Sequence, residues 1–527
     1  MAATAQPVSG ITVSRPQTSP WMIAVAVMLA TFMEVLDTSI AAVALPYIAG
    51  SVSATNDEAT WVLTSYLVAN AIVLPASGWF SIKFGRKRFL ITCIAIFTVS
   101  SFFCGAATSL GLILLARALQ GAGGGALQPL SQAILLESFP PEKRGLAMSV
   151  FALGVVVAPV LGPTLGGWLT ETYSWRWAFY INIPVGIFAV MMIARFVEDP
   201  PYIKNAKAGK FDGVGLGLLA VWLGALQIVL DKGQEDDWFG AVWIRWAVVI
   251  LVVAFVLFLV REFTHDKPLV RLSVFKNRNF AVGCILIFLF GAVVYALVTL
   301  LPLFFQELLG YTALAAGLAV SPRGLGSLFF MPMIGILTDR FDNRFLVCAG
   351  FIFTALCSFA LGRADLGISQ WSLLWPIVFS GASMSLIFVP LAATTMGTLP
   401  NEEIGNASGL YNLMRNVGGS IGIAVVNTLL VRHEQVHRSY MVHSINAVSH
   451  TFQDQYQALT AFLAQHTNAE TAGLQAYKMF ERSLDQQAAL LSYVDDFRYL
   501  AFLCLLCAPI AFAMKRVRGR GRSSAAH

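Results

Sequence analysis

Long runs of apolar residues recur along most of the chain, separated by shorter polar segments. A helix needs roughly 20 apolar residues to cross the hydrocarbon of a bilayer. Fourteen runs meet this requirement, so the pattern predicts an all-α membrane protein with fourteen membrane-spanning helices. The predicted spans are residues 21–45, 59–80, 89–107, 111–133, 146–168, 177–197, 213–230, 242–261, 280–302, 314–337, 345–362, 372–395, 408–430 and 497–514.

The composition agrees with a protein that faces lipid. Charged residues make up 12% of the chain and hydrophobic residues 57%, whereas a soluble domain has roughly 25% charged residues. The basic C-terminal cluster has no soluble basic face beside it, so no nucleic-acid partner is expected. No metal-ligand spacing and no nucleophile–base pair is found, so neither a cofactor nor an enzymatic activity is predicted.

Lys and Arg are distributed unequally between the predicted loops. If the chain starts inside the cell, the inner loops hold fifteen of these residues and the short outer loops hold three, Arg176, Lys232 and Arg363. Positive residues accumulate on the cytoplasmic side of membrane proteins. The sequence therefore predicts that both termini are cytoplasmic.

Two similar turns indicate an internal repeat, one joining spans 2 and 3 and the other joining spans 10 and 11. Repeated six-helix halves around a central site are typical of transporters. We predict a cytoplasmic segment 1–20, a first half 21–197, an inserted pair with its loops 198–279, a second half 280–514 and a basic cytoplasmic tail 515–527. The candidate gate residues in the two turns are Gly78, Lys83, Gly85, Arg86, Gly335, Asp339 and Arg340.

The long outer loop 431–496 contains no Pro and a single Gly, Gly473. Its apolar residues recur with helical spacing, as in Leu459, Phe462 and Leu463, which predicts amphipathic helix. Long loops usually have a function. We favour a docking surface for a partner, with a simple extracellular cap as the alternative.

Charges within spanning helices are costly, so each is a candidate functional residue. Glu34 and Asp37 are three residues apart and share one face of the first helix. Arg117 in the fourth helix needs a carboxylate or carbonyl partner. Pairing with a helix 1 carboxylate would make a charge switch that depends on protonation, whereas a static structural ion pair is the alternative. We predict proton coupling through Asp37, Glu34 and Arg117.

A central cavity between the halves is expected to bind the substrate. Arg323 and Arg415 fall in or near spans 10 and 13, and Arg415 has Asn412 and Asn416 within reach as hydrogen-bond partners. An electropositive cavity around Arg117, Arg323 and Arg415 would favour an anionic substrate. The predicted lining residues are Gln120, Asn182, Tyr180, Tyr295, Gln306, Arg323, Tyr411, Asn412 and Arg415.

Small residues in four-residue steps along the fifth span form a stripe that allows another helix to approach closely. Two prolines add a bend. The residues of this predicted packing and conformational motif are Gly154, Pro159, Gly162, Pro163, Gly166 and Gly167.

Several segments resemble the fourteen-helix drug:proton antiporters of the major facilitator superfamily. Leu36 to Pro46 is similar to the helix 1 signature of that family, Arg117 to Gly121 to its helix 4 motif, and Gly154 to Gly167 to its helix 5 antiporter motif. Trp175 to Gly186 also fits. The stretch Leu230 to Phe239 and the long loop before span 14 are similar to the inner-membrane pumps of tripartite multidrug systems.

The resemblance implies that Asp37 is the acidic helix 1 position of the family and Arg117 its helix 4 arginine, acting in proton transfer. It implies a location in the bacterial inner membrane, with drugs and protons as ligands. It also implies a periplasmic membrane fusion protein and an outer-membrane channel as partners. The chain departs from the family at Ile82, where an acidic residue normally helps to latch the gate. The latch of the first half must therefore rely on Lys83, Arg86 and Lys87 against another group.

The predicted function is proton-coupled multidrug efflux by alternating access. One alternative is a dedicated exporter of a single metabolite, such as a siderophore or a fatty acid. Another is a membrane scaffold that transports nothing and works through residues 431–496.

Overall fold

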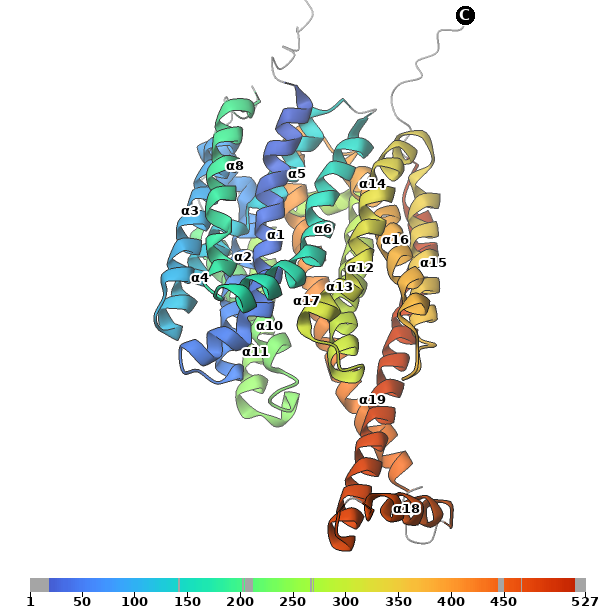
Figure 1. The fold of residues 1–527 in the computed structure, drawn as a ribbon. Coiled ribbons are helices and arrows are strands. Elements are labelled where there is room, and N and C mark those ends of the chain that lie inside the picture. Colours follow the sequence, from blue (N-terminus) through green and yellow to red (C-terminus); the bar gives the residue numbers. More distant parts are fainter. Residues whose placement is uncertain are drawn as a thin grey trace, which may run out of the picture.

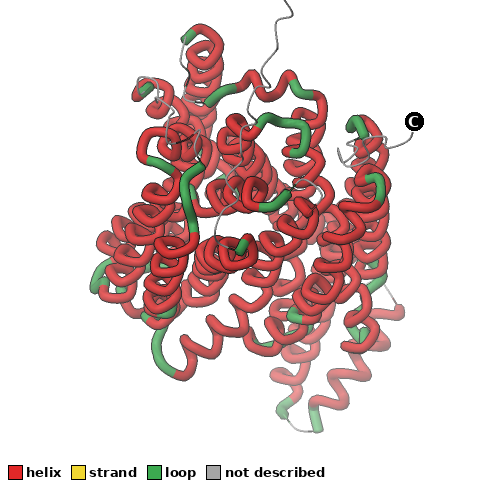
Figure 2. The backbone as a smooth tube through the Cα atoms, turned by 90° about the horizontal axis from the view of Figure 1, so that it is seen from above, coloured by secondary structure: helices red, strands yellow, loops and turns green. Residues whose placement is uncertain are grey.

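The computed structural model describes residues 19–140, 143–200, 203, 212–265, 268, 270–443, 450–465 and 467–516. Within these residues the regular structure is helical, with no strand (Figure 1, Figure 2). The predicted segment 1–20 and the basic tail 515–527 lie mostly outside the described residues.

Thirteen helices of the described chain are long and apolar enough to cross a membrane, and the bent helix α6 brings the number to fourteen. The two segments of α6, Arg144–Pro159 and Leu161–Thr172, meet at 41°. The bend follows from Pro159 and Pro163, because a proline inside a helix removes a backbone donor and clashes with the preceding turn. The structure thus confirms the all-α membrane fold that the sequence predicts.

The first group of helices packs into a bundle around α1. Glycines between spans allow the sharp connections: Gly85, which joins α2 to α3, has a φ of 84°, a conformation that side chains rarely adopt. The members are α1 (Pro20–Ser51), α2 (Asn56–Phe84), α3 (Arg86–Ala106), α4 (Leu110–Gly124), α5 (Leu127–Ser138), α6 (Arg144–Thr172), α7 (Trp177–Tyr180) and α8 (Asn182–Phe196).

The second bundle begins at α12, whose first turn is capped by the Asn277 side chain. Ser369 and Asn468 cap α16 and α19 in the same way. The members are α12 (Arg278–Leu303), the π-helical turn η4 (Phe304–Leu308), α13 (Ala313–Val320), α14 (Pro322–Arg340), α15 (Asn343–Leu361), α16 (Gln370–Met396), α17 (Asn401–Val442), α18 (His450–Leu463), α19 (Ala469–Ile510) and the short turn η5 (Ala511–Ala513).

The inserted pair lies between these bundles in the sequence. α10 (Gly213–Lys232) and α11 (Val242–Thr264) pack against each other, and α10 also contacts α2 and α17. Large apolar side chains such as Val249, Ile250 and Val253 on α11 are exposed, which is expected of a helix that faces lipid. Short 3₁₀ turns, η2 (Trp238–Gly240) and η3 (Leu272–Lys276), flank α11.

The two ends of the molecule differ. The terminal end is where α1 begins and η5 finishes, with Arg278 donating a hydrogen bond to the carbonyl of Ala513 at 2.8 Å. The hairpin end is the opposite one, from which α17 and α19 project beyond the other helices with α18 across their tip (Figure 1).

The projection corrects two predicted boundaries. The span 408–430 and most of the span 497–514 are parts of continuous 42-residue helices, α17 and α19, and α19 is followed by η5. At 1.5 Å per residue such a helix is about 63 Å long, roughly twice the thickness of the hydrocarbon. The sequence between 431 and 496 is mainly helical as predicted, with turns at 443, 464–465 and 467–468, while residues 444–449 and 466 lie outside the described residues. It extends the two spans instead of forming a separate domain.

Candidate functional site

A cavity of about 840 Å³ lies between the two bundles. On α1 its lining begins at Glu34 and continues to Tyr47, and on α2 it covers the first half, from Leu63 to Ala71. These segments belong to the half of the molecule nearer the hairpin end. Exposed side chains at the rim, Tyr47 and Gln306, are also on that side. The cavity therefore opens toward the hairpin end.

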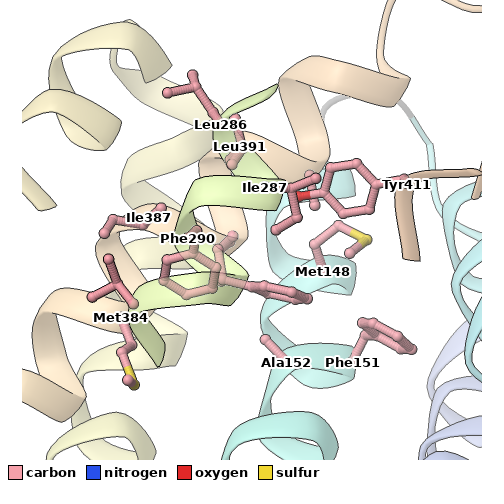
Figure 3. Packing of buried hydrophobic residues seen from close by; sticks show 14 of the residues in the cluster. Met148, Phe151, Ala152, Leu286, Ile287, Phe290, Met384, Ile387, Leu391 and Tyr411 are labelled. Atoms are coloured by element: carbon pink, nitrogen blue, oxygen red, sulfur yellow. The ribbon is translucent and has the colours of Figure 1, made fainter. Parts of the chain in front are cut away.

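An apolar layer closes the cavity on the other side. Phe151 of α6 stacks on Phe388 of α16 with ring centroids 6.2 Å apart, and Phe290 of α12 lies 6.2 Å from the same ring. Figure 3 shows Met148 and Phe151 of α6 facing Phe290 across this layer. Because the layer joins both bundles and its side chains are buried, it separates the cavity from the terminal end.

Predicted gate residues form a second closure at the terminal end. The backbone N–H of Gly145 donates to Asp339 at 2.9 Å, which ties α6 to α14. Gly78 of α2 lies so close to α17 that a Cβ there would be 3.2 Å from the Cα of Asn406. Gly335 allows a similar approach of α14 to Ser149. Lys83 and Arg340, also predicted at the gate, are exposed.

The turn between α2 and α3 shows what replaces the acidic residue absent at Ile82. Arg86 forms an ion pair with Glu137 of α5 at 2.6 Å. The backbone N–H of Lys87 donates to Asp199 at 2.8 Å, and the Lys87 ammonium donates to a carbonyl of α8. A Cβ at Gly85 would overlap the Asp199 carboxylate, so this contact and the positive φ both require glycine.

The corresponding turn of the second bundle carries its own ion pair. Asp342 accepts hydrogen bonds from Arg344, the closest contact being 2.7 Å. These bonds hold the pKa of Asp342 below its usual value, against the opposing effect of partial burial. Arg516 lies 3.6 Å from the same carboxylate, so the start of the predicted basic tail is beside this turn.

Asp37 and Arg117 form a fully buried ion pair of 2.6 Å. The Asp37 carboxylate also accepts from Gln120 at 2.9 Å and from Asn182 at 2.6 Å. Arg117 in turn donates to the carbonyl of Val62 at 3.0 Å, and its guanidinium stacks over the ring of Tyr66, 4.4 Å away. The Asp37 carboxylate accepts three hydrogen bonds and donates none, as a carboxylate in an ion pair does. The predicted meeting of helix 1 and helix 4 charges is present.

Glu34 has different surroundings. It is 5% exposed and lines the cavity, whereas Asp37 is sealed behind Arg117. Neutral groups hold its carboxylate: Asn70 donates at 3.1 Å, Tyr66 at 3.3 Å and Gln128 at 2.5 Å.

Gln128 links Glu34 to the opposite bundle. Its amide nitrogen donates to Glu34, and its amide oxygen accepts a hydrogen bond from Arg415 of α17. Arg415 also makes the contact with Asn416 that the sequence suggests, at 3.4 Å. A single amide thus connects a carboxylate of the first bundle to a cation of the second at the base of the cavity.

The predicted cavity residues separate into two groups. Tyr295, Gln306, Arg323 and Arg415 line the cavity, and the other five do not. Gln120 and Asn182 lie behind it as partners of Asp37. Tyr180 packs on the other side of the bundle against Phe102 and Trp177, because α7 turns its ring toward α3.

Tyr411 and Asn412 lie below the cavity at the interface between bundles. Both are fully buried, and Asn412 donates to Gln132 of α5 at 2.8 Å. They precede Arg415 by about one helical turn, and α17 starts at the terminal end. They therefore lie on the terminal side of the apolar layer.

Several lining residues are absent from the prediction. Asn70 and Gln128 are neutral, so a search limited to charges in spanning helices passes over them, although isolated polar residues in apolar runs carry a similar signal. Leu223, Leu226 and Gln227 come from α10, the inserted pair. Nothing in the apolar pattern of α10 distinguishes a cavity wall from a lipid-facing surface.

Polar contacts attach α10 to both bundles. Thr64 of α2 donates to Asp231 at 2.6 Å, and Gln227 donates to the same carboxylate at 3.0 Å. Ser420 of α17 donates to Gln227 at 2.9 Å. α10 therefore covers the seam between α2 and α17.

The predicted glycine stripe packs α6 against α1. A Cβ at Gly162 would overlap Ser39, and those at Gly154 and Gly166 would press on Met28 and Ile40. The Ser39 hydroxyl donates to the carbonyl of Pro159 at 3.1 Å. In a regular helix this carbonyl would accept from the N–H of residue 163, but Pro163 has none. Gly167, by contrast, has no atom within 4 Å of such a Cβ, since it faces the cavity.

Comparison with known proteins identifies relatives along most of the chain. The model of the Major Facilitator Superfamily matches residues 27–423. The multidrug export protein EmrB of Escherichia coli K12 is 38% identical over 436 residues, which are 82% of this chain and 85% of EmrB. The fatty acid resistance protein FarB of Neisseria gonorrhoeae is 36% identical over 491 residues, 92% of this chain and 94% of FarB.

The fold agrees with these sequence relatives. The solved structure of XylE, a proton:xylose symporter of the major facilitator superfamily, superposes with a TM-score of 0.55 at 16% identity, covering 92% of this chain and 94% of XylE. By family model, relatives and fold, this chain is a multi-pass membrane protein that belongs to the major facilitator superfamily and is similar to EmrB.

Proposed function

We propose that this chain is a proton-driven exporter of amphipathic toxic compounds, working by alternating access. The observation that carries the proposal is the position of Glu34. Its carboxylate borders a large, mainly apolar cavity and is joined through Gln128 to Arg415 of the other bundle. The names of EmrB and of other multidrug export relatives support the choice of substrates.

In this proposal the structure corresponds to the state open to the outside. A proton that enters from the hairpin end reaches Glu34 first, since Asp37 lies behind Arg117. A protonated carboxyl group has one acceptor position fewer, so the Gln128 bridge to Arg415 weakens. The bundles are then free to close over the cavity and to open at the terminal end, where the proton leaves and the next substrate enters.

The driving energy is the proton gradient, whose electrical part is about 2.3 kcal/mol per charge per 100 mV. The terminal end is cytoplasmic and the hairpin end periplasmic, as the distribution of Lys and Arg predicts. Asp37 and Arg117 are proposed to keep helices 1 and 4 in register around Glu34. The gate and glycine-stripe residues are proposed to set the closed end.

The projecting helices α17, α18 and α19 are proposed to bind a periplasmic membrane fusion protein, which in turn joins an outer-membrane channel. Exposed apolar side chains on the projection support a protein partner, because apolar residues on a water-facing surface mark interaction sites. They are Val436, Tyr440, Val442, Phe462, Leu474, Tyr477 and Met479.

The test is proton-gradient-driven uptake of ethidium into inverted membrane vesicles. We expect Glu34→Gln to lose the dependence on the gradient while ethidium still moves down its own gradient. Asp37→Asn is expected to lower thermal stability instead, since leaving a buried Arg117 without its carboxylate costs about 3–5 kcal/mol. The double variant Asp37→Asn/Arg117→Gln should regain part of that stability.

Two results would contradict the proposal. Gradient-dependent transport that survives intact in Glu34→Gln would remove Glu34 from proton coupling. Absence of ethidium transport by the folded wild-type protein would remove the multidrug function and favour a dedicated exporter or a scaffold.

A further inference from the structure

Arg323 is a buried cation at the wall of the cavity. It lies in the first turn of α14, is 1% exposed and lines the cavity. None of its three guanidinium nitrogens has a hydrogen-bond partner among the described residues. A guanidinium offers five N–H donors, so this side chain presents an unused binding group to the cavity.

The other arginines of the cavity each have hydrogen-bond partners, unlike Arg323. Arg117 is paired with Asp37 and bonded to a carbonyl. Arg415 donates to Gln128 and to Asn416 through one guanidinium nitrogen, while its other two nitrogens have no partner among the described residues. The acidic groups of the lining are Glu34, which already has three donors, and Glu171 at the exposed rim. Arg323 is therefore the arginine of the described lining with no hydrogen bond at any of its guanidinium nitrogens.

A buried charge without a partner is strongly destabilising, because its lost hydration is not replaced. An anion that reaches Arg323 restores that interaction through charge-assisted hydrogen bonds, which a planar guanidinium forms well with carboxylates.

Close helix packing fixes the position of Arg323. A Cβ at Gly381 of α16 would overlap the carbonyl of Arg323, and a Cβ at Gly326 would overlap the carbonyl of Val378. The hydroxyl of Ser327 donates to the carbonyl of Gly381 at 2.9 Å. Since α14 and α16 touch through their backbones at Arg323 and again one turn after it, the guanidinium is held on a rigid support.

We propose that Arg323 binds the acid group of an amphipathic anion, a carboxylate or a sulfonate, whose apolar body lies against Phe290, Met384 and Phe388. The cavity then has two poles: Glu34 on the first bundle attracts cationic substrates, and Arg323 on the second binds anionic ones. This inference rests on the proposed export function and adds a substrate class and the residue that selects it.

The test uses two fluorescent probes with the same apolar body, pyrenebutyrate and pyrenebutyltrimethylammonium. The purified full-length protein is reconstituted in phosphatidylcholine vesicles, which contain no anionic lipid to compete. Equilibrium binding and proton-gradient-driven uptake are measured for the wild type, Arg323→Gln and Arg323→Lys. We expect Arg323→Gln to lower the ratio of anion to cation affinity at least about tenfold, as loss of charge-assisted bonds implies. Arg323→Lys should fall between the other two.

An unchanged affinity ratio in a folded Arg323→Gln protein, verified by its melting temperature, would overturn the inference. Equal losses for both probes would do the same, since Arg323 would then be structural. If the wild type transports the cation but does not bind the anion, the inference fails while the export function stands. If neither probe is transported but anion binding depends on Arg323, the inference stands and the export function fails.

Discussion

Glu34 and Asp37 are one helical turn apart on α1, but they differ in how their carboxylates are held. Asp37 is bound by a cation and two amides in a site closed to the cavity. Glu34 is bound only by neutral donors and borders the cavity. Protonation of a carboxylate that is held by neutral donors costs less free energy, because no buried cation is left unpaired. This difference supports the proton-exchanging role that is proposed for Glu34.

A prediction at this scale concerns Gln128. Replacing it with Ala removes a donor from Glu34 and an acceptor from Arg415, at a cost of about 1–3 kcal/mol for the groups left unsatisfied. We expect gradient-driven ethidium uptake by Gln128→Ala to fall about tenfold. The matched control is Gln132→Ala, which removes another buried amide bond between the bundles, to Asn412, outside the cavity. An equal fall in uptake by both variants at equal expression would mean that Gln128 acts only as packing.

The sequence predicts part of this site and not the rest. A buried charge needs a partner, so the pairing of Arg117 with a carboxylate of helix 1 could be predicted, but not that the carboxylate is Asp37 and not Glu34. The partners of Glu34 are neutral and come from α2 and α5, and their meeting depends on how the helices rotate about their axes. Tyr180 shows the same limit, since one residue of helical rotation, about 100°, separates a cavity wall from a lipid-facing surface.

Among the helices, α17 and α19 depart most from the prediction. The apolar runs end near residues 430 and 497, but the helices continue because the segment between them lacks proline and has a single glycine. A helix can continue without apolar side chains when a neighbouring helix supports it. Here Arg438 of α17 and Asp485 of α19 form an ion pair of 2.7 Å. Hydropathy therefore locates the membrane, whereas capping and breaking residues locate the helix ends.

The projection leads to a prediction at the scale of elements. None of the described residues beyond 431 lines the cavity, so replacing 443–468 with a short Gly-Ser turn should leave ethidium uptake by inverted vesicles close to normal. The same variant should lose drug resistance in intact cells, where export would depend on the proposed partner proteins. The double variant Arg438→Ala/Asp485→Ala serves as control, because an exposed ion pair contributes about 0–1 kcal/mol. If cells that carry the shortened variant keep their drug resistance, a docking role of the projecting helices is excluded.

As a whole the molecule is closed at the terminal end by several independent contacts and open at the hairpin end. The apolar layer at Phe388, the bond between Gly145 and Asp339 and the approach of Gly78 to Asn406 all join the two bundles. Opening the terminal end requires all of them to separate together. This is the two-state behaviour that alternating access needs.

A disulfide provides the test at this scale. A Cβ at position 78 would lie 3.6 Å from the Cβ of Asn406, within the range of about 3.5–4.5 Å for disulfides. We expect oxidation of Gly78→Cys/Asn406→Cys to hold the terminal end closed and to stop ethidium transport, with recovery after reduction. The single variants are the controls, since the native cysteines are unpaired. Undiminished transport by the fully cross-linked protein would mean that the terminal end does not open there.

The attachment of α10 has a consequence for membrane lipids. Acyl chains of membrane lipids can enter a transporter where its two bundles separate within the plane of the membrane. α10 covers one such place, the seam between α2 and α17. It is linked to α2 by hydrogen bonds of two charged groups, the Asp231 carboxylate and the Lys232 ammonium, whereas its hydrogen bond to α17 is between neutral groups. Charged bonds are the stronger kind, so α10 is expected to move with the first bundle and part from α17. The additional helix pair would then move with the first bundle along α17 and keep lipid out of the cavity throughout the transport cycle.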